Sequence, residues 1–376
     1  MKRILVCYFG HSGSGPLISY QLVRSFSLRN DTKTMVALSS KLSKHSEWLS
    51  LENVDIRFFD LPNKFTEILS FSHLSAELGR LAAQVVNFSP NAVVFTMIHP
   101  LNYIVAKKLK QSCGKNTKFI SIIHDPKPHL GERVWVRVLQ RLELRFPDAF
   151  ITLSESSKEI LKKQTSKPIM ALMHPLLASE VNESAEISFF DTRSVMNKFI
   201  FLFYGRLEPY KGLEFLIEAF KRLQFERDDV YLVVAGKGKI SRRLRAEIRE
   251  LEDRKTAVFI NRYLSDKEVH SLIRLSDVVV IPYTEATQSG IIPQVLPLRK
   301  PIITTCVDGL VEQSFFGQLA MLVPPKNSFF LYLAMKRFCE NNETIKAHFA
   351  RALEKEYKLP TFDDLAENII NFVESL

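Results

Sequence analysis

Cysteines and long apolar runs are both scarce in this sequence. The 376 residues include four cysteines, at positions 7, 113, 306 and 339, and no pair has C-x-x-C spacing. This scatter argues against a disulfide framework and a cysteine-based zinc site and favours reduced thiols. No apolar run approaches the ~20 residues of a transmembrane helix, and the run near the amino terminus is too short for a secretory signal. We therefore expect a cytoplasmic protein without a membrane span.

Acidic side chains are scarce in the first half of the chain. Residues 1–170 contain 24 Lys and Arg against 13 Asp and Glu, whereas the remainder contains 27 against 28. The whole net charge of +10 therefore comes from the first half. Such a one-sided basic domain suits an anionic partner: a membrane surface, a pyrophosphate-linked lipid or nucleic acid. The alternative is a basic surface that serves solubility alone.

Short apolar runs alternate with helical patterns along the chain, which is typical of α/β layers around parallel sheets. Strands are expected at 3–9, 34–40, 54–59, 91–98, 118–124, 148–154 and 168–173, and in a second series at 199–204, 230–236, 257–264, 278–283, 301–305 and 320–325. Residues 174–195 lack strong periodicity and read as a linker. We expect two doubly wound, Rossmann-like domains, 1–178 and 195–360, that face a cleft. The amphipathic segment 361–376 is expected to pack back on the first domain as a helix.

The stretch 199–212, FIFLFYGRLEPYKG, is the most informative part of the chain. An apolar strand ends in a Gly turn, and the cations Arg206 and Lys211 follow before a helix begins. Backbone N–H groups at a helix start bind anions, and cationic side chains strengthen such a site. The stretch therefore predicts an anion site, and the alternative is a buried strand with two solvated charges.

A second strand, loop and helix pattern follows the run at 278–283. Glu285 lies in the expected loop, and Gln288, Ser289 and Gly290 are expected at the start of the next helix. Exposed N–H groups between Ser289 and Ile292 would favour a phosphate, and Glu285 would accept hydrogen bonds from sugar hydroxyls. The alternative is an ordinary capped helix.

Two further strand ends in the second half carry candidate contacts for a base, a ribose, a sugar or a phosphate. Gly236 makes a tight turn after one strand, and Arg262 and Tyr263 are expected near the end of the next. Ser265 and Glu268 then have the spacing of a capping box, so part of this motif serves to start a helix.

The first half opens with a strand and a Gly-rich loop, GHSGSGP. A loop of this kind between a strand and a helix lets a phosphate come close to the backbone N–H groups. The loop holds Gly10, Gly13 and Gly15 in G-x-x-G-x-G spacing, which departs from the dinucleotide fingerprint G-x-G-x-x-G. The second expected strand also ends without the acidic residue that a nicotinamide ribose requires. A dinucleotide-dependent oxidoreductase is therefore disfavoured.

Histidines follow two neighbouring strands of the first half. His99 follows one, and His124 and Asp125 follow the next, with His129 shortly after. Because ligands of a doubly wound sheet gather at the carboxyl ends of its strands, these residues are candidates for catalysis or for the acceptor side. The alternative is hydrogen bonding within loops.

The segment 132–145 is expected to be a basic amphipathic helix. Arg133, Arg137, Arg141 and Arg145 recur at i,i+4 spacing and would form one stripe. Basic amphipathic helices lie on anionic membranes. The stripe agrees with the charge of the same half, although a core-facing helix with a solvated basic side is the alternative.

Together these stretches resemble the retaining GT-B glycosyltransferases of the glycosyl transferases group 1 type, family 4 of these enzymes. The resemblance is carried by GRLEPYKGLEFLIEAF, HSLIRLSDVVVIPY and TEATQSGIIPQVLPLRKPIITTCVDGLVEQ in the second half, and by the early Gly loop and HDPKPH in the first. It covers nearly the whole chain. It implies a GT-B fold whose second domain binds a nucleotide-sugar donor.

The resemblance also implies roles for individual residues. Arg206 and Lys211 match the pair that binds the donor diphosphate, and His124 matches the histidine that contacts the transferred sugar. The matches to the donor-phosphate loop and to the backbone over the diphosphate are Gly13, Gly290 and Ile291.

One departure concerns the acidic residues of the donor site. The family often carries two Glu with seven residues between them, but Thr287 and Val295 occupy these positions when Gly290 is aligned with the usual loop Gly. Glu285, two residues earlier, is the candidate substitute and is assigned with His124 to the catalytic centre.

The resemblance implies a hexosyltransferase-type enzyme (EC 2.4) that transfers a sugar from a nucleotide-diphosphate sugar to a glycan or lipid-linked acceptor, with retention and without nucleic acid as a partner. The sequence has no Asp-x-Asp motif, so no metal and no cofactor are expected. Cations and helix termini would stabilise the leaving diphosphate instead. The alternatives are a GT-B nucleotide-sugar epimerase, a phosphorylase, and a non-catalytic GT-B protein that binds a sugar or a partner.

Overall fold

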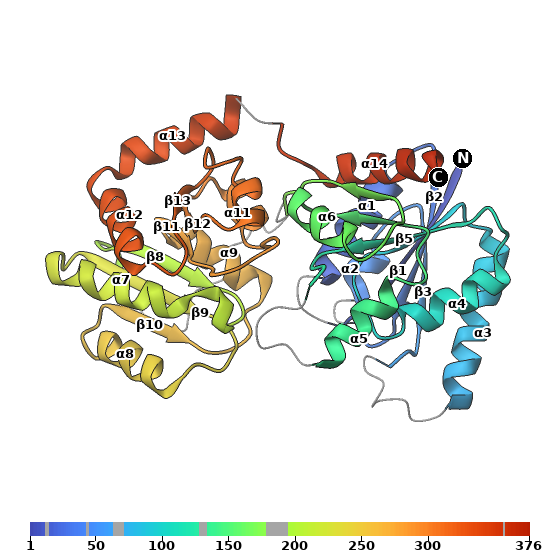
Figure 1. Ribbon diagram of the computed structural model, residues 1–376, viewed down its shortest axis with the longest axis horizontal. Coiled ribbons are helices and arrows are strands. Elements are labelled where there is room, and N and C mark those ends of the chain that lie inside the picture. Colours follow the sequence, from blue (N-terminus) through green and yellow to red (C-terminus); the bar gives the residue numbers. More distant parts are fainter. Residues whose placement is uncertain (12–14, 43–44, 63–70, 128–133, 178–194, 356–357) are drawn as a thin grey trace. The chain divides into compact units, whose positions relative to one another are not determined.

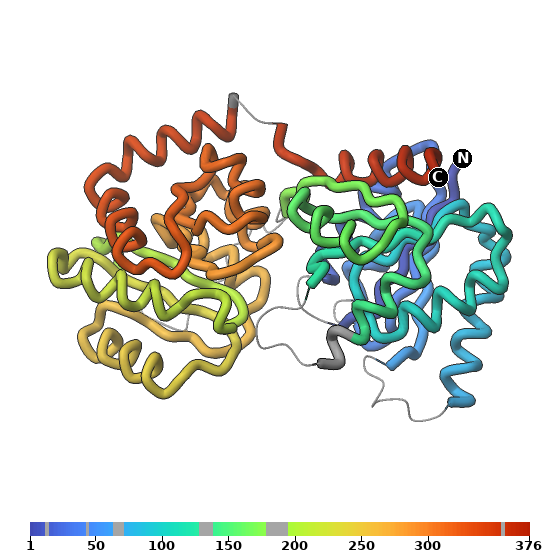
Figure 2. Tube along the Cα trace, viewed as in Figure 1, coloured from blue at the N-terminus to red at the C-terminus, as the bar shows by residue number. Residues whose placement is uncertain are grey.

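The computed structural model describes residues 1–376 except 12–14, 43–44, 63–70, 128–133, 178–194 and 356–357. The described residues form two compact units. The first unit contains those up to Pro175 together with Pro360–Leu376, and the second contains those of Leu176–Leu359. The end of the chain thus belongs to the first unit, where Figure 2 shows the red C-terminal segment beside the blue N-terminal one. Most of the predicted linker lies outside the described residues.

The first unit is built around a parallel sheet of seven strands in the order β3-β2-β1-β4-β5-β6-β7. The strands are β1 (Lys2–Tyr8), β2 (Thr32–Ser39), β3 (Val54–Phe59), β4 (Ala92–Phe95), β5 (Lys118–Ile123), β6 (Ala149–Thr152) and β7 (Ile169–Ala171). The helices are α1 (Gly15–Ser27), α2 (His45–Leu49), α3 (Phe71–Phe88), α4 (Asn102–Ser112), α5 (Val134–Glu143), α6 (Glu155–Lys162) and α14 (Phe362–Ser375).

The second unit repeats this plan with six parallel strands in the order β10-β9-β8-β11-β12-β13 (Figure 1). The strands are β8 (Phe199–Tyr204), β9 (Val230–Ala235), β10 (Ala257–Ile260), β11 (Val278–Ile281), β12 (Ile302–Thr305) and β13 (Met321–Val323). The helices are η3 (Pro209–Lys211), α7 (Leu213–Glu226), α8 (Arg242–Asp253), α9 (Asp266–Leu275), α10 (Ile292–Val295), η4 (Leu296–Leu298), α11 (Asp308–Gln313), α12 (Ser328–Glu340) and α13 (Asn342–Lys355).

The prediction of two doubly wound α/β sheets is confirmed. Each predicted run overlaps a strand because helices cover parallel strands on both faces, so that most strand residues are apolar. The residues of β9 and β11 are all buried. Several strands end earlier than predicted: β4 stops at Phe95 rather than at residue 98, and β10 at Ile260 rather than at 264.

Helix α14 completes the first unit. It begins with a capping box between Thr361 and Asp364 and packs against α1. Its carboxyl end is held by Lys118, whose Nζ donates to the backbone oxygen of Leu376 at 2.9 Å. The last helix of the chain is therefore part of the packing of the first sheet. No helix among the described residues is long and apolar enough to cross a membrane.

The strand orders locate the place where each sheet would bind a ligand. In the first sheet, connections leave in opposite directions from β1 and β4, and in the second from β8 and β11. Ligands of open α/β sheets bind beyond the carboxyl ends of the strands at such a switch point. The loops after β8 and β11 carry the predicted anion site of the second half, and those after β1 and β4 carry the Gly loop and His99.

Candidate functional site

The turn after β8 presents the two predicted cations of the second unit. Gly205 has a φ of 118°, which favours glycine, and it turns the chain out of the strand. Arg206 follows and is exposed, while Lys211 ends η3 and is half-buried. Gly212 is left-handed, and a Cβ there would lie 1.9 Å from the carbonyl oxygen of Pro282. The glycines thus let the segment 205–212 lie directly against the end of β11.

Lys211 is held by an aromatic residue at the end of β11. Its Nζ lies 3.8 Å from the ring centroid of Tyr283 and donates a hydrogen bond to the hydroxyl of the same residue. Tyr283 is fully buried, and its burial raises the pKa of the hydroxyl, against lowering effects of the Ser289 hydrogen bond and the Arg206 charge. The backbone N–H of Thr284 also donates to the carbonyl of Tyr210 at 2.8 Å. The two segments are therefore joined by backbone and side-chain contacts.

The loop after Tyr283 differs from the prediction in two respects. The helix that follows, α10, begins only at Ile292 and has four residues, so Gln288, Ser289 and Gly290 precede it. The backbone N–H of Ser289 donates to Gln313 Oε1 at 2.6 Å, and that of Ile291 donates to Ser289 Oγ at 3.1 Å. The expectation of exposed N–H groups is therefore wrong for these two, because each already has a partner.

Gly290 remains the sterically open position of this loop. A Cβ built at Gly290 would meet nothing within 4 Å. Gln288 is half-buried, and its Oε1 is buried without a hydrogen-bond partner. Among the predicted phosphate contacts of this loop, Gly290 thus has the backbone that a ligand can approach most closely.

Neither position aligned with the family's glutamates can act as a carboxylate. Thr287 is buried, and Val295 is fully buried in the apolar core of the second unit. Glu285 is half-buried in the same loop. It is the acidic residue that the loop offers at this edge of the sheet.

The remaining predicted contacts of the second unit have local explanations. A Cβ at Gly236 would lie 1.7 Å from the carbonyl oxygen of Gly205, so glycine is required where β8 and β9 end side by side. Arg262 pairs with Glu268 at 2.5 Å, and Glu268 completes the predicted capping box with Ser265. Tyr263 is 78% exposed. Because β10 ends at Ile260, Arg262 and Tyr263 do not belong to the strand.

In the first unit, His124 follows β5 and is buried. Its Nε2 lies 3.0 Å from the carbonyl oxygen of Thr96, and only a protonated nitrogen can donate to a carbonyl. The hydrogen is therefore on Nε2, and Nδ1 carries a lone pair. Burial lowers the pKa of His124, so the ring is neutral at physiological pH.

Two more histidines lie buried at the same edge of the first sheet. The ring of His174, just after β7, lies edge-on to that of His124 with centroids 6.3 Å apart. Its Nδ1 donates to the carbonyl of Pro175 at 2.8 Å, and burial lowers its pKa to about 4. His99 accepts a hydrogen bond from the Leu101 N–H, and burial lowers its pKa to about 3. All three are thus neutral hydrogen-bonding groups.

Other predicted residues of the first unit are only partly described. Gly13, His129 and Arg133 lie outside the described residues, as does the side chain of Arg137. Asp125 is half-buried, and its carbonyl accepts a hydrogen bond from Gln140 of α5 at 3.2 Å. Arg141 and Arg145 are exposed, as a basic stripe requires.

Two glycines of the Gly-rich loop have a packing role. A Cβ at Gly10 would lie 2.5 Å from the hydroxyl of Tyr8, and one at Gly15 would lie 2.7 Å from the same atom. Tyr8 is buried at the end of β1. Its ring therefore occupies the space that side chains at both positions would need, and these two glycines are explained without a phosphate.

Comparison with known proteins identifies the second half of the chain. Residues 184–355 match the family described as glycosyl transferases group 1. This segment is a glycosyl transferases group 1 domain. Two curated relatives match over short stretches: the uncharacterized glycosyltransferase YqgM of Bacillus subtilis is 32% identical over 143 residues, and the alpha-D-kanosaminyltransferase of Streptomyces kanamyceticus is 30% identical over 146. These matches span 38% of this chain and 38% and 37% of the relatives, respectively.

Solved structures extend the likeness of the fold to the whole chain. HepE of Anabaena, solved with UDP and glucose, covers all of this chain with a TM-score of 0.74 and 16% identity. Sucrose-phosphate synthase from Thermosynechococcus elongatus also covers all of it, with a TM-score of 0.72 and 15% identity. The prediction of a GT-B fold is confirmed.

Sequence reasoning missed three residues at these sites. His174 had a readable signal, because it follows a strand just as His99 and His124 do. Tyr283 also follows a strand, but its contact with Lys211 depends on the turn of the group 1 domain between β8 and η3. Gln313 contacts Ser289, which lies 24 positions earlier in the sequence, and no local sequence pattern predicts this contact.

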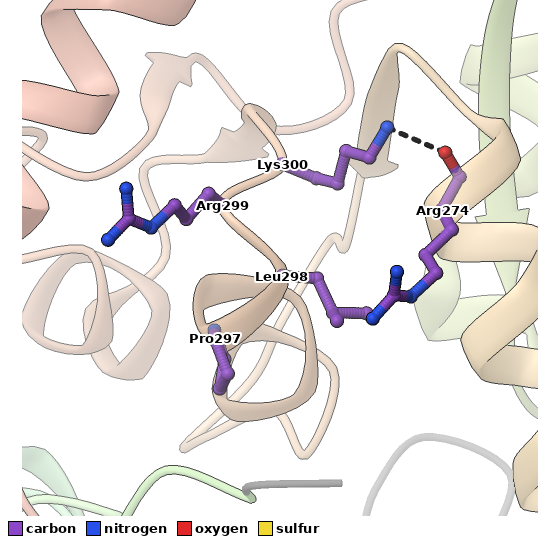
Figure 3. A pocket seen from close by; sticks show the side chains of 5 residues that line it. All are labelled: Arg274, Pro297, Leu298, Arg299 and Lys300. Atoms are coloured by element: carbon purple, nitrogen blue, oxygen red, sulfur yellow. Dashed lines mark hydrogen bonds between the residues drawn. The ribbon is translucent and has the colours of Figure 1, made fainter. Parts of the chain in front are cut away.

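The group 1 domain also has a basic hollow of about 340 Å³, apart from the loop 284–291. Arg274, Pro297, Leu298, Arg299 and Lys300 line it (Figure 3). Arg274 precedes β11 and Lys300 precedes β12, so the hollow lies at the amino ends of these strands. Lys300 Nζ donates to the carbonyl of Arg274 at 2.7 Å, and Arg299 pairs with Glu354. These two cations therefore have partners within the fold.

Proposed function

We propose that the protein is a retaining glycosyltransferase that moves a sugar from a nucleotide-diphosphate sugar to a hydroxyl of a glycan or lipid-linked acceptor. The observation that carries the proposal is the arrangement of Arg206 and Lys211 at the switch point of a group 1 domain, with Lys211 held by Tyr283. Two cations at the carboxyl edge of a parallel sheet, one of them held in place by Tyr283, suit a diphosphate.

The chemistry follows from the charge that develops during transfer. When the bond from the sugar to the diphosphate breaks, positive charge grows on the anomeric carbon and negative charge on the leaving oxygen. Arg206 and Lys211 stabilise the leaving diphosphate because their charges are already in place, and the Gly290 N–H adds a donor. The acceptor hydroxyl attacks on the face from which the diphosphate leaves, which retains the anomeric configuration.

His124 and Glu285 contact the sugar in this proposal. The neutral His124 accepts a hydrogen bond from a sugar hydroxyl through Nδ1, since its Nε2 hydrogen is used by Thr96. Glu285 takes the place of the missing family glutamates and accepts from a hydroxyl of the sugar or of the ribose. Asp125 and His99, from the loops after β5 and β4, border the acceptor.

The proposed reaction requires no metal ion, because the two cations neutralise the diphosphate. Turnover is therefore expected to persist in excess EDTA. Full loss of activity in EDTA, restored by added Mg²⁺ or Mn²⁺, would contradict this part of the proposal. The cellular setting proposed with it is the cytoplasm, at the inner face of the plasma membrane, in the assembly of a surface polysaccharide or glycolipid.

The first test is a thermal-shift screen with a panel of nucleotide sugars and free nucleotides. A ligand that binds the native state at 100 times its Kd stabilises it by about 2.7 kcal/mol. UDP-glucose is the first compound to include, because HepE has been solved with it. A donor is expected to raise the melting temperature of the wild type and to raise it less for Lys211→Ala. No shift with any nucleotide sugar would contradict the donor site.

A second candidate function is a non-catalytic GT-B protein that binds a sugar or a partner. The observation that favours it is the loss of both family glutamates, at the positions of Thr287 and Val295. A protein of this class would bind a donor and release no diphosphate with any acceptor. An epimerase or a hydrolytic enzyme would convert the donor without an acceptor, so product analysis with and without acceptor separates the three classes.

A further inference from the structure

Gln313, the last residue of α11, pairs with the backbone of the loop 284–291, which is called the donor loop because the proposed donor binds beside it. Its Oε1 accepts from the N–H of Ser289 at 2.6 Å, and its Nε2 donates to the carbonyl of Ser289 at 3.0 Å. Both residues are buried, with 3% of their surface exposed. One side chain therefore satisfies both backbone groups of a residue 24 positions away.

A carboxamide is needed for this pairing. It carries one acceptor and one donor in the plane of an amide, as a peptide group does, and it fits the N–H and C=O of one residue. An ionised carboxylate can only accept, so it would leave the carbonyl of Ser289 facing an oxygen. Because a buried polar group without its partner is destabilising, the loop would move if Gln313 were replaced by glutamate.

The pairing is connected to Lys211 through the side chain of Ser289. Ser289 Oγ accepts from the N–H of Ile291 at 3.1 Å and lies 3.4 Å from the hydroxyl of Tyr283. Tyr283 in turn contacts Lys211 Nζ. A continuous series of polar contacts thus runs from α11 to the cation that faces the proposed diphosphate.

Helix α11 supports the same loop at a second point. A Cβ at Gly309 would lie 1.9 Å from the carbonyl oxygen of Thr287, so the backbone of the helix touches the loop directly. Thr305, at the end of β12, donates through its hydroxyl to the carbonyl of Tyr283 at 2.6 Å. The segment from β12 to α11 is therefore the support on which the donor loop rests.

We propose that Gln313 is a positioning residue that fixes the donor loop and directs the N–H of Gly290 toward the diphosphate. The inference rests on the proposed function, because it assumes that a diphosphate binds beside this loop. Gln313 does not touch the donor. It uses the N–H of Ser289, so that the next N–H along the loop, on Gly290, is the one presented to the ligand.

The wild-type protein provides a first test through amide hydrogen exchange. The Ser289 N–H is expected to be protected without any ligand, and the Gly290 N–H is expected to gain protection when UDP-glucose or UDP is added. Rapid exchange at Ser289 in the ligand-free protein would overturn the pairing. This measurement needs no variant, so it stands even if substitutions at the buried position 313 prevent folding.

The second test compares Gln313→Glu with Gln318→Glu, which adds the same charge at an exposed residue of the same region. Gln313→Glu is expected to lower kcat/KM for the donor about 10-fold or more at pH 8, because small misplacements of a site group lower rates strongly. At lower pH the buried carboxyl binds a proton and can donate to Ser289, so activity relative to wild type should recover. Gln318→Glu should match the wild type at every pH.

The other charged groups at this edge are the same in each variant. They are Arg206 after β8, Lys211 in η3, Glu285 in the loop, and Asp308 and Glu312 in α11. Because these groups titrate alike in both proteins, their effect cancels in the ratio of variant to wild-type kcat/KM at each pH. A Gln313→Glu enzyme that folds and keeps wild-type kinetics from pH 5.5 to 8 would overturn the inference.

The outcome also separates this inference from the proposed function. If Arg206→Ala and Lys211→Ala lose turnover while Gln313→Glu does not, only the role of Gln313 fails. If the two cation variants keep wild-type activity, the donor site fails. The protection of the Ser289 N–H would then remain as a structural property of the loop.

Discussion

The Lys211 ammonium lies over the ring of Tyr283, 3.8 Å from its centroid, and donates a hydrogen bond to the hydroxyl of that residue. Tyr283 is fully buried, so the ring is a fixed support. A flexible lysine thus has a defined position before any ligand binds. Because the ordering is already complete, less conformational entropy is lost when an anion arrives.

Arg206→Ala and Lys211→Ala are each expected to reduce turnover of the donor on the order of 10²-fold or more. The reason is the loss of a charge-assisted contact worth ~3 kcal/mol to the leaving diphosphate. Steady-state kinetics with the donor found by thermal shift will measure this. Arg243→Ala is a suitable control, because Arg243 is exposed on α8. Near-normal turnover in both cation variants would remove the donor-site assignment.

Tyr283→Phe is expected to lower kcat/KM by a smaller factor, roughly 5-fold. It removes the hydroxyl that bonds to Lys211, and a hydrogen bond of this kind contributes ~1 kcal/mol, while the ring under the ammonium remains. Tyr231→Phe, at another buried tyrosine on β9, controls for effects on folding. A Tyr283→Phe enzyme as impaired as Lys211→Ala would mean that the hydroxyl does more than hold the lysine.

Gly15→Ala is expected to destabilise the protein by about 1–3 kcal/mol, as overpacking of a core does. In open space the same change in a helix stabilises by roughly 0.5–1 kcal/mol. Gly79→Ala in α3 is the matched control, since a Cβ there meets nothing within 4 Å. Urea unfolding will give both values.

The assignment of the Gly15 effect to Tyr8 is tested by a double mutant. In a Tyr8→Leu background the ring is gone, so adding Gly15→Ala should be much less destabilising than in the wild type. Equal effects in the two backgrounds would show that Tyr8 is not the obstacle.

Glu143 is expected to make the protein less stable as the pH rises from about 4.5 to 8. Its carboxyl is buried on α5, and burial raises its pKa to about 8, although Ser121 and Asn102 donate hydrogen bonds to it at 2.6 and 3.1 Å. The folded state holds this proton up to about pH 8, whereas the unfolded state loses it near pH 4.5. The stabilisation is therefore complete below the unfolded pKa and lost as the pH rises to the folded one.

This pH dependence is measured by unfolding the wild type and Glu143→Gln across the interval. The wild type should lose at most ~1.4 kcal/mol per pH unit from this group, and Glu143→Gln should not. Glu52→Gln, at an exposed residue, should keep the wild-type slope. If the free energy of unfolding changed with pH in the same way for the wild type and Glu143→Gln, the prediction would be contradicted. The buried histidines act in the opposite direction, because their lowered pKa values make acid destabilising, and both proteins share that effect.

Replacing Arg141 and Arg145 together with Ser is expected to weaken binding to vesicles that contain anionic lipid. Both side chains are exposed on or just after α5, and each basic residue near such a surface contributes ~1 kcal/mol. Co-sedimentation with vesicles at low salt will measure the change. One control uses neutral vesicles, and the other is a double variant on α8 in which Arg243 and Arg245 are both replaced with Ser. Unchanged binding to anionic vesicles would remove the proposed membrane contact.

The fold could be predicted well because of how parallel strands are buried. A strand covered by helices on both faces, such as β9 (VYLVVA), reads as an uninterrupted apolar run, and its flanking turns mark its place. Strand ends were less predictable, since apolar side chains also occur in buried loops. Met97 and Ile98 are half-buried in the loop after β4, and they made the apolar run appear longer than the strand.

The candidate site could be predicted only where its residues lie close in sequence. The Gly turn and the cations Arg206 and Lys211 form one local pattern, and the histidines were visible as polar residues after apolar strands. The sequence by itself therefore determined the α/β class, the two series of strands and the Gly turn with its two cations, because each follows from local composition and periodicity.

Only the tertiary structure decided which N–H groups of the loop 284–291 are already hydrogen-bonded and which side chain holds Lys211. Packing of α11 against the donor loop gave the Ser289 N–H to Gln313 and left Gly290 as the open position. Packing around the end of β11 buried Tyr283 and fixed Lys211 on it. Such contacts join residues 24 and 72 positions apart. Burial and hydrogen bonding between distant segments depend on the folded chain, so local sequence cannot specify them.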